Sequence, residues 1–384
     1  MENALPLSGI RVIEFSHVIM GPALGCVLAD LGADVIKVEP APHGDHTRRM
    51  SGAMSGVFIY FNRNKRAVSL DLNTSQGFHD LVHLIASADV LTENFRPRML
   101  EDLGLNAERL KEINPRLVTC SLKGFLRGPY DGRTAMDEAV QMMAGLAFMT
   151  GPAGRPLRAG ASVNDIMGAL FGAIGILAAL RERDRTGHGS HVSTGLFETC
   201  AFLVGTHMAK EAVTGEPCEP MPERRNVFGI YDVFRTRDRS ELFVGVVSDR
   251  QWEAFCNGIG REDLLDVPEF ASNADRLKAR PRLIPIVAAI LEQFTRLELE
   301  QRLEQYGISF APVARPSDLF DDPHLVAGGG LLNIATPDGG RTKLPALPLE
   351  FDGVRMGLRR QPPNVGEHND EVLSEVPDRR RMPL

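Results

Sequence analysis

Short runs of β-branched and aliphatic residues alternate with segments of helical periodicity along the first two hundred residues. Five runs have the length and composition of buried strands: Ile10–Phe15, Asp34–Val38, Ala67–Leu72, Val90–Glu93 and Leu117–Ser121. Strands separated by helices are typical of βαβ units, in which helices cover a parallel sheet. The pattern therefore predicts an α/β fold whose large domain is Rossmann-like.

Capping signals mark the helices between these runs. We expect Pro22 to open one helix with Gly32 just beyond its end, and Asn73-Thr74-Ser75 to cap another. A longer helix is predicted from about Asp165 to Arg185. Its apolar stretch, 166–180, is shorter than the ~20 residues that span a bilayer and is rich in glycine and alanine. We therefore expect a buried helix that another backbone approaches closely, and no membrane association.

The character of the chain changes after about residue 200, where a proline-rich, charged segment begins at residue 215. We predict a discontinuous large domain and a smaller α/β domain with strands near 231–236 and 242–247. The expected boundaries are 1–200 for the first part of the large domain, 201–226 for a linker, 227–306 for the small domain, 307–347 for a second, loop-like linker and 348–384 for the rest of the large domain.

The composition excludes several classes of protein. Hydrophobic residues make up 43% and charged residues 24%, which are globular values. The net charge of −7 argues against a nucleic-acid partner or an anionic membrane surface. Five scattered cysteines form no CxxC pair and have no histidines at metal-ligand spacing, so we expect reduced thiols, no metal and a cytoplasmic location. The N-terminus lacks a basic region followed by an apolar core, so no signal peptide is expected.

Common catalytic and cofactor motifs are missing. The first predicted strand is followed by SHVIMGPALG rather than by the G-x-G-x-x-G fingerprint, which disfavours a nicotinamide enzyme. There is also no phosphate loop of the G-x-x-x-x-G-K type, no G-x-S-x-G elbow and no H-E-x-x-H pair.

A series of other motifs runs through the chain in order. They are LSGIRVIE with Gly21-Pro22, LADLGADVIKVE at 28–39, Gly44-Asp45 with Thr47-Arg48, NRNKR at 62–66 before Leu70-Asp71-Leu72, ENFRP at 93–97, Gly187-His188-Gly189 and Gly366-Glu367-His368. Together they span nearly the whole chain, and their order resembles that of the class III CoA-transferases. The resemblance implies an enzyme that moves coenzyme A from an acyl-CoA to a small carboxylic acid, with no cofactor besides coenzyme A itself. It also implies an interlocked homodimer with active sites between subunits, for which the two predicted linkers supply slack.

The resemblance places the nucleophile at Asp165, where the long helix is predicted to begin. A carboxylate can attack a thioester to give a mixed anhydride, which CoA thiolate converts to an aspartyl-CoA thioester. The helix N-terminus would favour the ionised carboxylate, and nearby amides would stabilise an oxyanion. Position alone favours the simpler interpretation that Asp165 stabilises the first helical turn, and only the family pattern favours the nucleophile.

Two further residues are catalytic candidates. Asp137 matches a segment that faces the active site in this family, although a helix N-cap is an equal interpretation. Related racemases have a histidine just before this acid, and it forms a proton-transfer pair with the aspartate at the helix start. Here that position is Met136, which cannot exchange a proton, so an acyl-CoA racemase stays an alternative that lacks one member of the pair. A non-catalytic CoA-ester binding protein is the other alternative. His17 follows the first strand at the ligand-binding edge and would contact the acyl group or thioester, or be satisfied within its loop. Ile19 stands where many of these transferases have glutamine, so the acids remain open.

Coenzyme A carries phosphates that require guanidinium groups and backbone donors. The resemblance places its binding site at Val18, Leu70, Asp71, Leu72, Asn73, Asn94, Phe95, Arg96 and Arg98, and less directly at Arg48. Phe95 would lie near the adenine. Arg224 and Arg225, beside Asn226, are candidates for the acid's carboxylate, although linker arginines are usually only solvated.

Overall fold

A computed structural model describes residues 5–96, 98–223 and 227–375 of the chain. The contacts divide the chain into two compact units. The large unit comprises the described residues up to Pro222 and from Pro323 onward, and the small unit comprises those from Glu223 to Asp322. Arg224, Arg225 and Asn226 lie outside the described residues.

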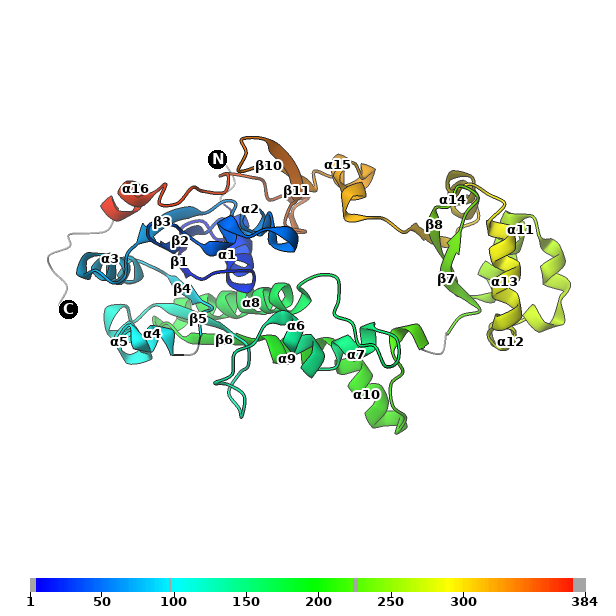
Figure 1. The fold of residues 1–384 in the computed structure, drawn as a ribbon, viewed down its shortest axis with the longest axis horizontal. Helices are drawn as coiled ribbons and strands as arrows, with labels where there is room; N and C mark the ends of the chain where they lie inside the picture. The colour runs from blue at the N-terminus through cyan, green and yellow to red at the C-terminus, as the bar shows by residue number, and fades with distance from the viewer. Residues whose placement is uncertain (1–4, 97, 224–226, 376–384) are drawn as a thin grey trace. The chain divides into compact units, whose positions relative to one another are not determined.

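The large unit is built on a six-stranded parallel sheet (Figure 1). Its strand order, β3-β2-β1-β4-β5-β6, is that of a Rossmann fold, and the predicted fold class is confirmed. The strands are β1 (Arg11–Phe15), β2 (Asp34–Pro40), β3 (Arg66–Leu70), β4 (Val90–Glu93), β5 (Val118–Lys123) and β6 (His191–Gly195). The sixth strand was not predicted, because its residues HVSTG are mostly polar and two of the five are exposed at the sheet edge.

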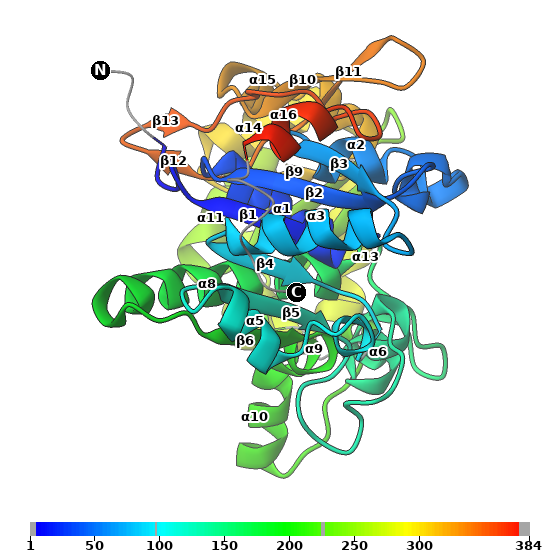
Figure 2. The same cartoon turned by 90° about the vertical axis from the view of Figure 1, so that its left-hand side faces the viewer.

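Helices cover both faces of this sheet (Figures 1 and 2). One core lies between the strands and two helices, α1 (Met20–Asp30) and α8 (Val163–Thr186). The opposite core lies beneath α3 (Ser75–Ala86), α4 (Met99–Asp102), α5 (Ala107–Ile113) and α16 (Asn369–Ser374). Thr74 caps α3 as expected, because its hydroxyl accepts a hydrogen bond from the amide of Gly77.

Small residues let α8 approach its neighbours closely, as predicted. An added Cβ at Gly168 would lie 2.3 Å from Met20 of α1, and one at Gly175 would lie 2.5 Å from Val192 of β6. By length and composition α8 is also the one helix among the described residues that could cross a membrane. Only one side of it is buried, since Ile174 on the outer side is 61% exposed. The expectation of a buried helix was therefore wrong for that side.

The Gly366-Glu367-His368 motif protects the exposed edge of the sheet. The backbone amide of His368 donates to the carbonyl of Ala67, and the amide of Ala67 faces Nδ1 of His368 at 3.2 Å. The side chain of Asn369 then binds the backbone of Ser69, accepting from its N–H at 2.8 Å and donating to its carbonyl at 3.1 Å. The polar edge of β3 is thus occupied by side chains and loop backbone, which prevents edge-to-edge pairing.

Several shorter elements complete the large unit. The helices are α2 (Val57–Phe61), α6 (Asp137–Met143), α7 (Leu146–Thr150), α9 (Leu196–Leu203), α10 (Gly205–Thr214) and α15 (Pro323–Ala327), and two hairpins are formed by β10 (Leu331–Ala335) with β11 (Arg341–Pro345) and by β12 (Glu350–Phe351) with β13 (Val354–Arg355). The segment 307–347 is therefore not loop-like as predicted, because it holds three strands and a helix.

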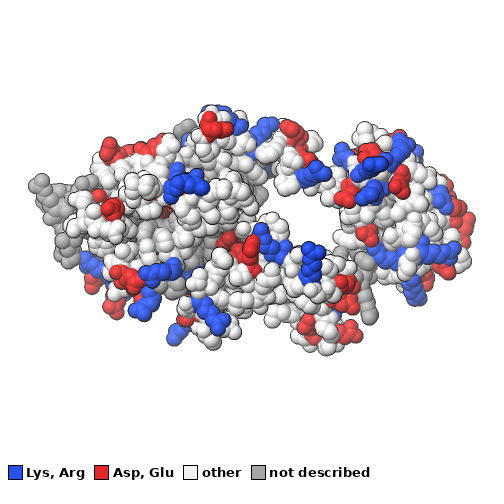
Figure 3. All heavy atoms as spheres, in the orientation of Figure 1, with Lys and Arg blue, Asp and Glu red and all other residues white. Residues whose placement is uncertain are grey.

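The small unit has its own core. An antiparallel sheet of β7 (Ile230–Arg235), β8 (Glu241–Val246) and β9 (Ser309–Pro312) packs against α11 (Asp249–Ile259), α13 (Arg280–Leu291) and α14 (Arg296–Gln305), with α12 (Asn273–Lys278) preceding α13. Trp252 and Phe255 lie at the centre of this core. On the face shown in Figure 3, acidic and basic side chains are interspersed over both units.

Candidate active site

The loops after β1 and β4 meet at the carboxyl edge of the sheet. These two strands are neighbours at the point where the strand order reverses, which is where ligands bind in open α/β sheets. The side chain of Asn94, after β4, accepts a hydrogen bond from the amide of His17 at 2.9 Å and donates to its carbonyl at 2.7 Å. The next residue, Val18, has a φ of +65°. The two loops are therefore joined at a backbone turn that is unusual for a β-branched residue.

A cavity of about 1880 Å³ opens at this edge, entirely within the large unit. Drug-sized ligands occupy pockets of roughly 300–1,000 Å³, so this cavity has room for a long ligand. It is lined by eight of the predicted site residues: His17, Val18, Asn94, Phe95, Arg96, Arg98, Asp137 and Asp165. The other four, Leu70, Asp71, Leu72 and Asn73, do not line it, because β3 lies two strands away from β1.

Asp165 lies in the first turn of α8 and at the wall of this cavity. The N-cap residue of the helix, Ser162, makes no side-chain capping bond. Asp137 takes that role instead, because its Oδ1 accepts hydrogen bonds from the amides of Asn164 at 2.8 Å and Asp165 at 3.2 Å. Asp137 is not the N-cap of its own helix, where Met136 occupies that position, so that alternative was wrong. Its carboxylate instead joins the start of α8 to α6.

The electrostatics of Asp165 differ from the expectation for a helix N-terminus. Burial, and then the negative charge of Asp137, raise the pKa of Asp165 to about 7. The first amides of α8 cannot offset this, because they already donate to Asp137. They are equally unavailable to a tetrahedral oxyanion. At neutral pH about half of the Asp165 carboxyl groups are ionised, and the ionised form is more basic than an ordinary carboxylate.

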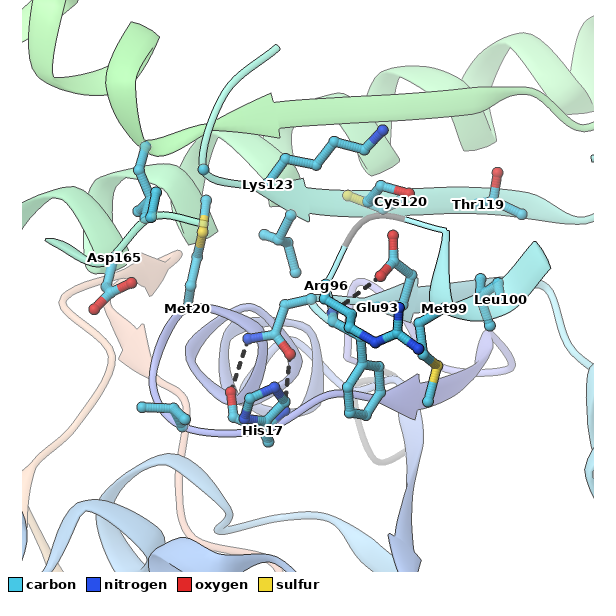
Figure 4. A pocket seen from close by; sticks show the side chains of 18 of the residues that line it. His17, Met20, Glu93, Arg96, Met99, Leu100, Thr119, Cys120, Lys123 and Asp165 are labelled. Carbon is cyan, nitrogen blue, oxygen red and sulfur yellow. Dashed lines mark hydrogen bonds between the residues drawn. The ribbon is translucent and has the colours of Figure 1, made fainter. Parts of the chain in front are cut away.

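The surroundings of Asp165 are mainly apolar. The terminal methyl of Met20 lies over Gly168, one turn after Asp165, and Figure 4 shows Met20 beside the carboxyl group. Met136 is 69% exposed and lines the same cavity. Burial lowers the pKa of His17, so its imidazole is neutral at pH 7. This end of the cavity therefore offers a carboxyl group among weakly polar walls.

A polar group of residues lies farther along the cavity, and of its members only Arg96 was among the predicted site residues. Glu93 ends β4, and Figure 4 shows it with Arg96 and Thr119 on the side away from Asp165. Burial raises the pKa of Glu93, and its carboxyl accepts a hydrogen bond from the amide of Phe95 at 3.1 Å. Lys123, at the end of β5, also lines the cavity. The signal available in the sequence was a charged residue at the carboxyl end of two predicted strands.

The predicted arginines differ in their availability. Arg96 and Arg98 are exposed and make surface ion pairs, with Asp102 at 2.9 Å and with Glu101 at 3.2 Å. Such pairs contribute little energy and exchange readily for a phosphate. Arg48 is instead held in the fold, because it pairs with Glu39 and donates to the carbonyl of Pro363. Arg48 is not among the residues that line the cavity, so the structure does not support it as a phosphate ligand.

The NRNKR motif at 62–66 serves the fold beneath the cavity. Lys65 is fully buried and pairs with Glu14 at 2.6 Å, and Arg63 pairs with Asp30 at 2.7 Å. Buried charges need such partners, since an unpaired charge in the interior is costly. This motif therefore holds strands and α1 together rather than facing the ligand.

Three buried cysteines and the potential metal ligands give no further reactive centre in the described part of the chain. Burial raises the pKa of Cys26, Cys120 and Cys256 to about 12, so their thiols are not nucleophilic at neutral pH. Among the described residues, no group of three or more histidine, cysteine or acidic side chains could hold a metal ion. Asp165 is the predicted nucleophile, and it combines a strongly raised pKa with a place on the cavity wall.

Comparison with known proteins gives the same family from sequence and from structure. The succinate–glutarate CoA-transferase of Agrobacterium fabrum is 32% identical over 97% of this chain and 96% of its own length. The human succinyl-CoA:glutarate CoA-transferase is 28% identical, covering 98% of this chain and 87% of its own. The crystal structure of a CaiB/BaiF family protein from Brucella suis superimposes with a TM-score of 0.87, at 31% identity, covering 97% of this chain and 100% of that one. Residues 7–369 match the family described as CoA-transferase family III, and the chain belongs to this family.

Proposed function

We propose that the protein transfers coenzyme A from an acyl-CoA thioester to a free carboxylic acid, with Asp165 as the nucleophile. The observation that carries the proposal is a buried carboxyl group of raised pKa on the wall of a long cavity, in a chain whose relatives are named as CoA-transferases. The raised pKa makes the ionised carboxylate a better nucleophile than a solvated aspartate, at the cost of a smaller ionised fraction.

The proposed reaction has four balanced steps. The Asp165 carboxylate attacks the thioester carbonyl, which forms a mixed anhydride and releases CoA thiolate. The thiolate attacks the aspartyl carbonyl of the anhydride, which forms an aspartyl-CoA thioester and releases the donor acid as its carboxylate. The acceptor carboxylate then attacks the aspartyl thioester to give a second anhydride and thiolate. Attack of this thiolate on the acyl carbonyl yields the new acyl-CoA and regenerates Asp165.

The neighbouring residues have distinct roles in this proposal. Asp137 keeps Asp165 in place through the backbone of α8 and keeps its pKa high through its charge. Neutral His17 contacts the acyl group or the thioester from the opposite loop. Arg96 and Arg98 meet the phosphates of coenzyme A, because their present ion pairs are exposed and weak.

The proposal is tested by trapping the covalent intermediate. The protein is incubated with succinyl-CoA and glutarate, the acids named for the relatives, and with other carboxylates, and product formation is followed by mass spectrometry. Hydroxylamine added with the acyl-CoA should leave a hydroxamate on the peptide that contains Asp165. D165N should lose at least about a thousandfold of the transfer activity, as removal of a nucleophile does in other covalent enzymes.

A matched control lies on the same helix. D184N removes an exposed aspartate from the last turn of α8 and should transfer coenzyme A like the unaltered protein. Hydroxamate formation at another residue, or undiminished transfer by D165N, would contradict the assignment. Uptake of α-deuterium from heavy water by a 2-methylacyl-CoA without an acceptor acid would indicate a racemase instead.

We also propose that the protein works as a homodimer. The outer side of α8 and the adjoining helices expose Ile174, Phe202 and Val213, which are 61%, 71% and 85% accessible. Large apolar side chains that are exposed to this extent are typical of surfaces that bind another subunit. Light scattering coupled to size-exclusion chromatography tests the proposal, and a monomer at micromolar concentration would refute it.

A further inference from the structure

The turn that carries His17 into the cavity holds an unfavourable backbone conformation. Val18 has a φ of +65°, in the left-handed region, where a branched Cβ meets the neighbouring carbonyl. Conformations of this kind persist only where the surrounding structure imposes them. The turn lies between β1 and α1, and His17, Val18 and Met20 all line the cavity.

Asn94 supplies the first restraint on this turn. Its side-chain carbonyl accepts from the amide of His17 and its side-chain N–H donates to the carbonyl of the same residue, at 2.9 and 2.7 Å. Both polar atoms of Asn94 are therefore engaged with backbone on the other loop. An added Cβ at Gly21 would lie 3.1 Å from Asn94 and 2.3 Å from Ser16, so the start of α1 packs closely against both side chains.

Lys37 supplies the second restraint from below. Its ammonium group is fully buried and donates to the carbonyl of Ser16 at 2.9 Å. It also pairs with Glu14 at 3.1 Å and Asp45 at 3.0 Å. Burial alone would lower the pKa of Lys37, but the carboxylates of Glu14, Asp45 and Glu39 outweigh it and raise the pKa, so the group stays charged. The charged Lys37 thus fixes the backbone at Ser16, two residues before the strained Val18.

We propose that Asn94 and Lys37 are positioning residues that impose the strained turn at Val18 and thereby hold His17 at the cavity wall and the first turn of α1 beside Asp165. The inference rests on the proposed function for its kinetic consequence. It differs from the role that the resemblance implies for Asn94, since the side chain is engaged with the turn rather than offered to coenzyme A.

The two anchors differ in how they can be tested. Removing Lys37 would leave Asp45 buried without its lysine partner and Glu14 with Lys65 alone, and such a variant would fold poorly. Asn94 can be removed with less damage. Glycine at position 18 adopts a positive φ without a steric cost, so V18G should make the turn less dependent on the two hydrogen bonds between Asn94 and His17.

The experiment is a double-mutant cycle between N94A and V18G. N94A should lower kcat by about 10- to 100-fold, because a small displacement of positioned groups is costly, while KM for the acyl-CoA changes by less than about threefold. The double variant N94A/V18G should recover at least about a tenth of the kcat that N94A loses. In thermal unfolding, the drop in Tm caused by N94A should be smaller in the V18G background than in the unaltered protein.

Asn369 provides the matched control, because it grips the N–H and carbonyl of Ser69 in the same way at an unstrained strand. The effects of N369A and V18G on Tm should simply add. Additive effects of N94A and V18G on Tm would overturn the proposal. So would a rise in KM with unchanged kcat in N94A that V18G does not reverse, because that result identifies Asn94 as a ligand of coenzyme A. If the unaltered protein transfers no coenzyme A, the proposed function fails, whereas the Tm cycle still decides whether Asn94 imposes the turn.

Discussion

Replacement of Asp137 by asparagine should shift the pH dependence of transfer to lower pH. The pKa of Asp165 is raised from 3.8 to about 7, first by burial and then by the charge of Asp137. Because burial is the larger cause, removing the charge should lower this pKa by less than half of the rise, or by about one pH unit. The carboxylate is the reactive form, so activity is present above the pKa and lost as pH falls through it. The acid limb of kcat/KM should therefore move down by about one pH unit in D137N.

The size of the effect depends on the pH of the assay. At pH 6 the ionised fraction of Asp165 should rise from about one tenth to about one half, which predicts a roughly fivefold gain in kcat/KM. Above pH 8 both proteins are ionised, and D137N should be equal or slower because a less basic carboxylate is a weaker nucleophile. Asparagine can still accept from the amides of Asn164 and Asp165. It cannot accept from Gln141 as the carboxylate does, so about 1 kcal/mol of stability should be lost.

The assay is kcat/KM for a productive donor and acceptor pair between pH 5 and 9, with circular dichroism to verify folding. E138Q is the control, since Glu138 is the next residue of α6 and its carboxylate pairs at the surface with Arg158. It should leave the acid limb in place. A limb that stays fixed or moves upward in D137N would show that Asp165 is not the titrating group or that Asp137 does not act on it.

Two further substitutions test the packing beneath the cavity. G25A should lower the free energy of unfolding by about 3 kcal/mol, because its Cβ would lie 1.8 Å from Glu14 in the buried charge network. Chemical denaturation measures this change, and G205A is the control, because a Cβ at this helical position meets open space and should be neutral or stabilising. G168A should fold, since the atom that its Cβ meets at 2.3 Å is the flexible end of Met20. The displaced methyl group should enter the cavity near Asp165 and raise KM for the acyl-CoA by about 2- to 10-fold. An unchanged KM would show that Met20 does not border the acyl group.

Much of the fold was open to prediction from local patterns. The five predicted strands of the large sheet are present, because buried β-branched runs bounded by caps depend on near neighbours in the chain. β6 was missed because an edge strand buries only one side. The segment 307–347 was misread for a related reason, since β9 is stabilised by pairing with β8, which lies far away in sequence.

The chemistry at Asp165 shows where such patterns stop. The helix start was predicted, but the electrostatic prediction was wrong because Asp137, 28 residues earlier, occupies the amides and adds its charge. Arg48 resembled a phosphate ligand in sequence and is paired with Glu39 in the fold. Which polar groups remain free for a ligand depends on what the rest of the chain has already bound.

The sequence alone determined the family, the α/β class and the position of the candidate nucleophile, because each is written in motifs and periodicities of a few residues. The tertiary structure decided the protonation of Asp165, the role of Asp137 and the clamp by which Asn94 holds His17 from 77 residues away. The physical reason is that burial and hydrogen bonding are set by groups that meet in space. Strand order, rather than the spacing of residues along the chain, brings those groups to the same edge of the sheet.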